Sequence, residues 1–68
     1  MAKNLNELDS VKLNKDFQNI SNGTEGAIVH KYNENDFEVE FFDKDGNTID
    51  VVTISKDYLD LIEKYDEK

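Results

Sequence analysis

The chain has 68 residues, with 16 acidic residues against 8 basic ones, a net charge of −8, and no cysteine or proline. This length suits one domain near the lower limit for folding alone. Without cysteine there are no disulfides and no thiolate metal sites, so stability must come from packing a small apolar core. The acidic balance argues against nucleic-acid and anionic-membrane partners and favours a basic protein partner.

The N-terminal third begins with residues 1–8, which are polar and predict a flexible lead-in. It contains no apolar run of the kind that forms a signal peptide or a membrane span, so we expect a cytoplasmic protein. Residues 10–13 alternate polar and apolar positions and predict a first edge strand. Residues 14–22 predict an irregular loop that Phe17 and Ile20 anchor into the core.

Two glycines mark the start of the next predicted strand. Gly23 and Gly26 flank Thr24 and Glu25, which predicts a positive φ or a close backbone approach at the entry to a strand over residues 27–32. A phosphate-binding loop would need a helix after the glycines, and a strand follows here instead. We therefore interpret the glycines as structural.

Residues 36–42 form the clearest predicted strand, because three apolar residues alternate with two glutamates and Phe42. The sequence DKDG at residues 43–46 predicts a type I turn with Gly46 in the left-handed region, followed by a bulge. The acidic spacing also resembles a calcium loop. An EF-hand, however, needs glycine at its sixth position and glutamate at its twelfth, where this chain has Ile54. We therefore predict a hairpin, with residues 48–54 as its returning strand.

The C-terminal segment is ambiguous from its pattern alone. Tyr58, Leu61, Ile62 and Tyr65 recur at helical spacing, which favours a helix that a serine at position 55 would cap. Leucines at 59 and 61 equally fit a short closing strand. Periodicity favours the helix, and both alternatives remain open at this point.

The run GTEGAIVHKY, followed by NDFEVEFFDKDGNTIDVVTIS, resembles the bacterial domain-of-unknown-function family numbered 4926. The resemblance covers about residues 8–62. Two features depart from the family pattern: Asp50 stands where an apolar residue is common, and the tail after Ile62 is longer and more charged. The positions that carry the resemblance are Leu8-Asp9-Ser10-Val11, Gly23, Gly26, Ile28-Val29, 37–41, Asp43, Asp45, Gly46 and Thr53-Ile54.

This resemblance implies an all-β fold, a small SH3-like barrel of about five antiparallel strands over residues 9–62. It also implies a single short helical turn at residues 56–58, then a last strand near residues 59–62, with residues 63–68 as a charged tail. The family has no established enzymatic activity. Some members sit beside toxin genes, in the arrangement typical of immunity proteins or antitoxins.

No set of residues points to catalysis. His30 is the only histidine, so no histidine pair can bind a metal or activate a serine. Glu38 and Glu40 lie two residues apart and share a strand face, but paired carboxylates catalyse only where a pocket shifts their pKa. We interpret that face as solvated, and we predict no enzymatic activity, no cofactor and no metal.

The same strand face carries the interaction hypothesis. If the apolar residues of 36–42 face inward, then Glu38, Glu40 and Phe42 face outward. The family's closing motif places Val52 and Ile54 in the core, so Ile49 and Val51 would join the outward face. Apolar side chains beside acids form a reasonable protein-binding patch. The alternative is that the C-terminal tail, through Tyr58 or Tyr65, covers this patch.

The leading hypothesis is a non-enzymatic protein-binding module, an immunity protein or antitoxin whose acidic face masks a basic toxin such as a nuclease. The alternative is an accessory or scaffold subunit of a larger enzyme or electron-transfer complex. In either case we expect a monomer or weak homodimer. In the toxin-masking mechanism carboxylates mimic phosphate charge and two apolar residues anchor the contact; the candidate residues are Glu38, Glu40, Asp43, Asp45, Asp50, Phe42 and Val51.

Overall fold

The structure is a computed structural model in which residues 4–65 are described. These residues form one antiparallel sheet of five strands in the order β4-β3-β2-β1-β5, with a single 3₁₀ turn, η1, before the last strand. The predicted all-β fold is confirmed. The elements are β1 (Ser10–Leu13), β2 (Glu25–Lys31), β3 (Asp36–Phe42), β4 (Thr48–Ser55), η1 (Lys56–Tyr58) and β5 (Leu59–Glu63).

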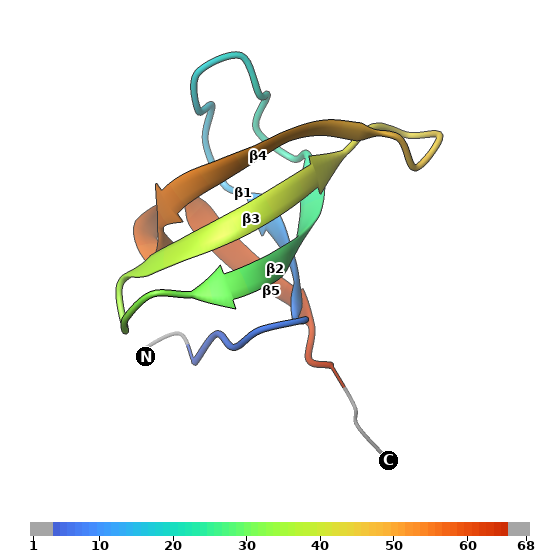
Figure 1. Ribbon diagram of the computed structural model, residues 1–68. Coiled ribbons are helices and arrows are strands. Elements are labelled where there is room, and N and C mark those ends of the chain that lie inside the picture. The colour runs from blue at the N-terminus through green and yellow to red at the C-terminus, as the bar shows by residue number, and fades with distance from the viewer. Residues whose placement is uncertain (1–3, 66–68) are drawn as a thin grey trace.

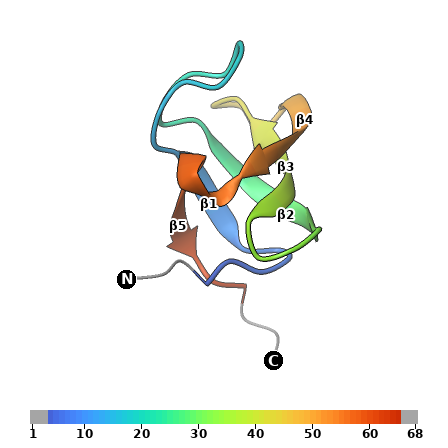
Figure 2. The same ribbon diagram turned by 90° about the vertical axis from the view of Figure 1, so that its left-hand side faces the viewer.

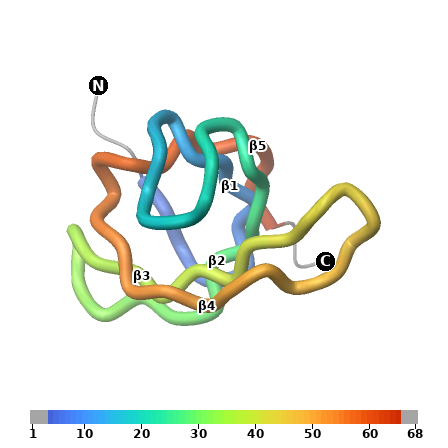
Figure 3. The backbone as a smooth tube through the Cα atoms, turned by 90° about the horizontal axis from the view of Figure 1, so that it is seen from above, coloured from blue at the N-terminus to red at the C-terminus, as the bar shows by residue number. Residues whose placement is uncertain are grey.

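The sheet curls so that its two ends face each other across the core. Figure 1 shows β4, β3 and β2 in front, with β1 and β5 behind them. The side view in Figure 2 and the view from above in Figure 3 separate the same two groups, with β3 and β4 on one side and β1 and β5 on the other. A curled five-stranded antiparallel sheet of this size is the small SH3-like barrel that the family resemblance implies.

Strict alternation along β3 builds the centre of this core. Phe37, Val39 and Phe41 are buried, whereas the residues between them are only half-buried. The period of two therefore separates an inward from an outward face, as predicted. Across the described residues, the buried apolar side chains are Leu5, Val11, Leu13, Ile20, Ile28, Phe37, Val39, Phe41, Ile54 and Leu59.

The glycines before β2 have the two roles that their spacing predicts. Gly23 has a φ of +93°. A Cβ atom at Gly26 would lie 2.6 Å from the backbone oxygen of Glu40 on β3. Only glycine allows β2 and β3 to approach so closely at this point.

The DKDG turn also forms as predicted. Gly46 has a φ of +85°, and its N–H donates to the carbonyl of Asp43 at 3.0 Å. The β3–β4 register shifts between Phe41 and Phe42, so Ile49 is the extra residue of a bulge. The calcium interpretation of this acidic sequence is unnecessary, because the turn accounts for its glycine and for Asp43.

The C-terminal segment is a turn and a strand, so the helix favoured by periodicity is wrong. Ser55 caps only the short η1, through its Oγ, which accepts from the Asp57 N–H at 3.2 Å. β5 then pairs with β1 and inserts Leu59 into the core, while Leu61 and Ile62 remain exposed. A helix would leave the free edge of β1 unpaired, and the β1–β5 ladder satisfies those backbone groups instead.

Segments outside the strands also contribute to the core. Leu5 is buried, so the lead-in predicted for residues 1–8 packs on the barrel at this point, and residues 1–3 lie outside the described range. Ile20 is buried, and the Phe17 ring meets the Tyr58 ring edge-on at 5.2 Å, which anchors the loop between β1 and β2 as predicted. The predicted charged tail begins inside β5 and continues through Tyr65; residues 66–68 lie outside the described range.

Candidate functional site

The outward side of the β3–β4 hairpin brings two acids and an apolar residue together. The ladder places Glu40 opposite Val51 and Glu38 opposite Thr53. Directly opposed side chains lie on the same side of a sheet, and this side is outward because Val39 and its neighbours fill the core. Below, the hairpin face means the outward side chains Glu38, Glu40, Phe42, Thr48, Val51 and Thr53.

As far as Tyr65, the last described residue, the C-terminal segment does not cover the hairpin face. Tyr58 packs against Phe17, and the Tyr65 N–H donates to Asp9 Oδ1 at 2.8 Å. Figure 1 shows β5 running behind the layer that contains β3 and β4. Val51 accordingly keeps 43% of its surface exposed, and Ile49 keeps 47%. Of the two alternatives for this patch, the structure shows the open one.

The two glutamates of the hairpin face have neutral partners. Glu38 Oε1 accepts from the Tyr32 hydroxyl at 3.1 Å, and Glu40 Oε2 accepts from the Thr48 hydroxyl. Between positions 36 and 55 the sequence has six acidic residues and one lysine, Lys44. In the part of the chain that the structure describes, no lysine pairs with either glutamate. Negative charge therefore accumulates on this side of the barrel without internal compensation.

Phe42, opposite Thr48, ends the outward side of β3 as predicted, and Asp43 and Asp45 follow in the turn beyond it. Asp43 Oδ1 accepts from the Asp45 N–H and the Asn47 N–H, both at 2.9 Å, so this carboxylate shapes the turn. Asp45 is exposed at the tip. Phe42 and Asp43 help to line an open hollow of about 800 Å³ between the turn and the start of β2; the lining residues are 22–25, 42–44, Gly46 and Ile49.

Asp50 is separated from the other candidate acids. It pairs with Phe41, which points into the core, so Asp50 belongs to the opposite side of β4 from Val51. The carboxylate is exposed, and its Oδ1 accepts from the Val51 N–H at 2.8 Å. Grouping Asp50 with the outward glutamates is therefore wrong in geometry, because the period of two places adjacent strand residues on opposite sides.

The remaining chemistry-bearing side chains do not converge on the hairpin face. His30 lies 3.3 Å from the Glu7 carboxylate and meets the Tyr32 ring at 4.6 Å, and it is half exposed. Tyr32 was missed as a support for Glu38, although the polar turn at residues 33–35 brings Tyr32, just after the end of β2, back beside β3. Residues 4–65 hold no group of three or more histidine or acidic side chains that could bind a metal.

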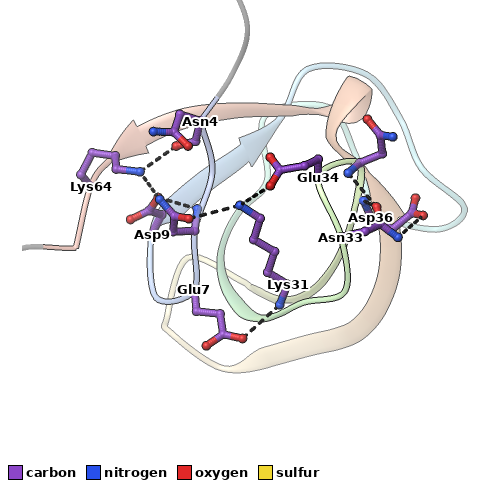
Figure 4. A network of polar contacts seen from close by, with 10 residues as sticks. Asn4, Glu7, Asp9, Lys31, Asn33, Glu34, Asp36 and Lys64 are labelled. Atoms are coloured by element: carbon purple, nitrogen blue, oxygen red, sulfur yellow. Dashed lines mark hydrogen bonds and ion pairs between the residues drawn. The ribbon is translucent and has the colours of Figure 1, made fainter.

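A buried carboxylate on the other side of the barrel was also missed. Asp9 is 1% exposed and accepts from Lys64 Nζ at 2.7 Å, from the Tyr65 N–H at 2.8 Å and from the Asn6 N–H at 2.9 Å. Figure 4 shows Lys64 reaching Asp9 and the Asn4 carbonyl together. Burial raises the pKa of Asp9, but the hydrogen bonds and the charge of Lys64 outweigh it and lower that pKa overall.

This carboxylate joins the two ends of the described chain, and all its polar partners are internal. Lys64 lies 55 positions away from Asp9, so no local sequence pattern signals the contact. We therefore assign Asp9 a structural role and retain the hairpin face as the candidate site.

Comparison with known proteins adds the family. None of the helical structure in residues 4–65 is long and apolar enough to cross a membrane. Neither the curated proteins nor the solved structures contain a match to this sequence. The family model for a domain of unknown function matches residues 7–61, which is most of the chain and includes all five strands except the end of β5. The chain therefore belongs to the family described as Domain of unknown function (DUF4926).

Proposed function

We propose that this protein is a non-enzymatic binding module that neutralises a basic protein, as a cytoplasmic immunity protein or antitoxin of a bacterium. The observation that carries the proposal is the hairpin face. There, Glu38 and Glu40 lie side by side on β3, an exposed Val51 lies opposite Glu40 on β4, and no lysine of the described chain neutralises the two acids.

The proposed mechanism uses charge for encounter and apolar contact for retention. A chain with a net charge of −8 attracts a basic partner over distances comparable to the Debye length, which raises the association rate. The two glutamates then occupy positions that phosphates would take in a nuclease site. Val51, beside them on β4, supplies apolar contact that is desolvated on binding and slows dissociation.

The size of the barrel sets how much surface such a partner must use. A standard protein interface buries about 800 Å² on each partner, whereas the whole surface of the protein measures 4660 Å². The hairpin face is too small to supply that area alone. We therefore include the adjoining turn and the hollow beside Phe42 in the proposed interface.

The test is capture of the partner from the native host at low salt. We expect the wild-type chain to retain a basic protein, and Glu40→Lys to lose it, because the substitution reverses a charge at the centre of the face. Glu63→Lys is the matched control, since it makes the same charge change on β5. Recovery of no basic protein, or equal retention by Glu40→Lys, would contradict the proposal.

A second function has one observation in its favour. Leu61 and Ile62 on β5 are 42% and 45% exposed, and adjacent exposed apolar residues are typical of a stable subunit contact. An accessory or scaffold subunit would co-purify with a multi-subunit assembly. Its binding would depend little on salt and would be lost in Ile62→Asp, whereas toxin masking would persist in that variant.

A further inference from the structure

The outer edge of β4 is an unprotected strand edge. Within residues 4–65, β4 pairs only with β3, so its other side has no strand partner. Natural proteins usually protect such edges with lysine, proline or very short strands. β4 has eight residues, six of them β-branched, with neither lysine nor proline, and Asp50 is its single charged residue.

The hydrogen bonds show which backbone groups face outward along this edge. The Val51 N–H donates to the Asp50 carboxylate, so it points away from β3. N–H and C=O groups of one strand residue lie on the same side, and that side alternates along the strand. Thr53, two residues further on, therefore also directs both groups outward. The edge offers the Val51 carbonyl and both backbone groups of Thr53, while Asp50 caps the Val51 N–H.

The same two residues stand opposite the glutamates of the hairpin face. Val51 is paired with Glu40, and Thr53 with Glu38. The outward backbone groups of β4 and the carboxylates of β3 therefore both recur at every second residue, at positions opposite each other. A strand added beside β4 would lie about 5 Å from β4 and about 10 Å from β3. Lysine or arginine side chains span that distance, with their apolar stems over Val51 and their charged ends at the carboxylates.

We propose that the basic partner docks by adding an antiparallel strand to the free edge of β4, with lysine or arginine at alternate positions. This inference rests on the proposed function and specifies the partner's binding element. The partner's cationic residues pair with Val51 and Thr53, so that their backbone groups bond to β4 and their side chains reach Glu40 and Glu38. Charge argues against a second copy as the occupant, because another β4 carries no cation.

The probe is an eight-residue peptide of alternating threonine and lysine, four of each, with blocked ends, titrated into the full-length chain at about 0.15 M salt. Two further peptides are methylated on the backbone nitrogens, one at every lysine and the other at every threonine. The two methylated peptides have the same charge and number of methyl groups. Only the lysine amides face β4 in the proposed alignment, so only methylation there removes donors to β4.

We expect the unmodified and threonine-methylated peptides to shift the amide resonances of Val51 and Thr53. The lysine-methylated peptide should bind about tenfold more weakly, from the loss of two hydrogen bonds. Equal affinity of the two methylated peptides, or a failure of all three peptides to bind, overturns strand addition. So does a shift of the Thr53 amide that depends on protein concentration alone, because a second copy would then occupy the edge.

A variant separates this inference from the function on which it rests. Glu38→Gln/Glu40→Gln should weaken all three peptides, because it removes the charges while leaving the backbone edge intact. One outcome would support the acidic face and contradict strand addition: the two methylated peptides bind wild type with equal affinity, and the double variant weakens both by the same factor. If the double variant changes the affinity of none of the three peptides, the proposed role of the acidic face in binding is contradicted as well.

Discussion

Two groups of acids on this barrel have opposite environments. Asp9 is buried, receives three hydrogen bonds and lies 2.7 Å from a lysine. Glu38 and Glu40 lie on the other layer, half-buried and partnered only by hydroxyl groups within the described chain. The first carboxylate uses its charge to join the chain ends. The other two leave their charge for a partner.

This difference separates stability from recognition in a very small domain. A buried carboxylate that loses its partners costs several kcal/mol, so its surroundings must stay complete. Half-exposed acids without a cation contribute little to folding and are free to vary. We expect substitutions at the two groups to differ in both size and kind of effect.

Asp9→Ala should have the largest effect. It leaves Lys64 Nζ and two backbone N–H groups without their acceptor, and we expect a loss of about 2–4 kcal/mol in the free energy of unfolding. Urea denaturation measures it. Asp45→Ala is the control and should change stability by less than about 0.5 kcal/mol, since Asp45 lies exposed at the turn tip. Similar losses of unfolding free energy in Asp9→Ala and Asp45→Ala would contradict the proposed difference between the buried and the exposed acids.

Gly26→Ala should distort the β2–β3 pairing that supports the hairpin face, without changing any charge. The new Cβ would lie 2.6 Å from the Glu40 carbonyl, so β2 and β3 must separate, at a cost of about 1–3 kcal/mol. Amide hydrogen exchange should rise along β3. Gly46→Ala is the comparison, because no atom lies within 4 Å of its Cβ position and only the φ of +85° is strained. Unchanged exchange in β3 would contradict the steric explanation.

Acidification should weaken the Asp9 contact specifically. Because the folded pKa of Asp9 lies below its unfolded value, its contribution is complete above the unfolded pKa of about 3.9 and is lost as the pH falls through the folded pKa. The stability gap between wild type and Asp9→Asn should therefore narrow below about pH 4. Urea midpoints of both proteins between pH 7 and pH 3 measure this gap. A gap that stays constant would show that the charge of Asp9 contributes nothing.

Glu38→Gln/Glu40→Gln should have the smallest effect on folding. Neither glutamate has a cationic partner among residues 4–65, and the double variant reduces the net negative charge. We expect the free energy of unfolding to stay within about 0.5 kcal/mol of wild type. A loss above about 1 kcal/mol by urea denaturation would assign these acids to the fold, because such a loss exceeds the range of simple surface changes.

Sequence patterns predicted the local elements well. The alternation in residues 36–42 and the glycines at 23, 26 and 46 identified β3, its turn and the entry to β2. The same reasoning failed at the tail, where the spacing of apolar residues fits a helix, yet only Leu59 is buried. The outward position of Glu38, Glu40 and Val51 was predictable from alternation, but the open state of that face was not.

By itself, the sequence determined what depends on neighbouring residues: the period of two, the turns that need positive φ, and the unbalanced acidic charge. The tertiary structure decided how the tail closes on β1, why Asp9 is buried, and which strand edge stays free. These features depend on contacts between segments as far apart as Asp9 and Lys64. Such contacts form only when the curled sheet brings distant segments together, so no local pattern encodes them.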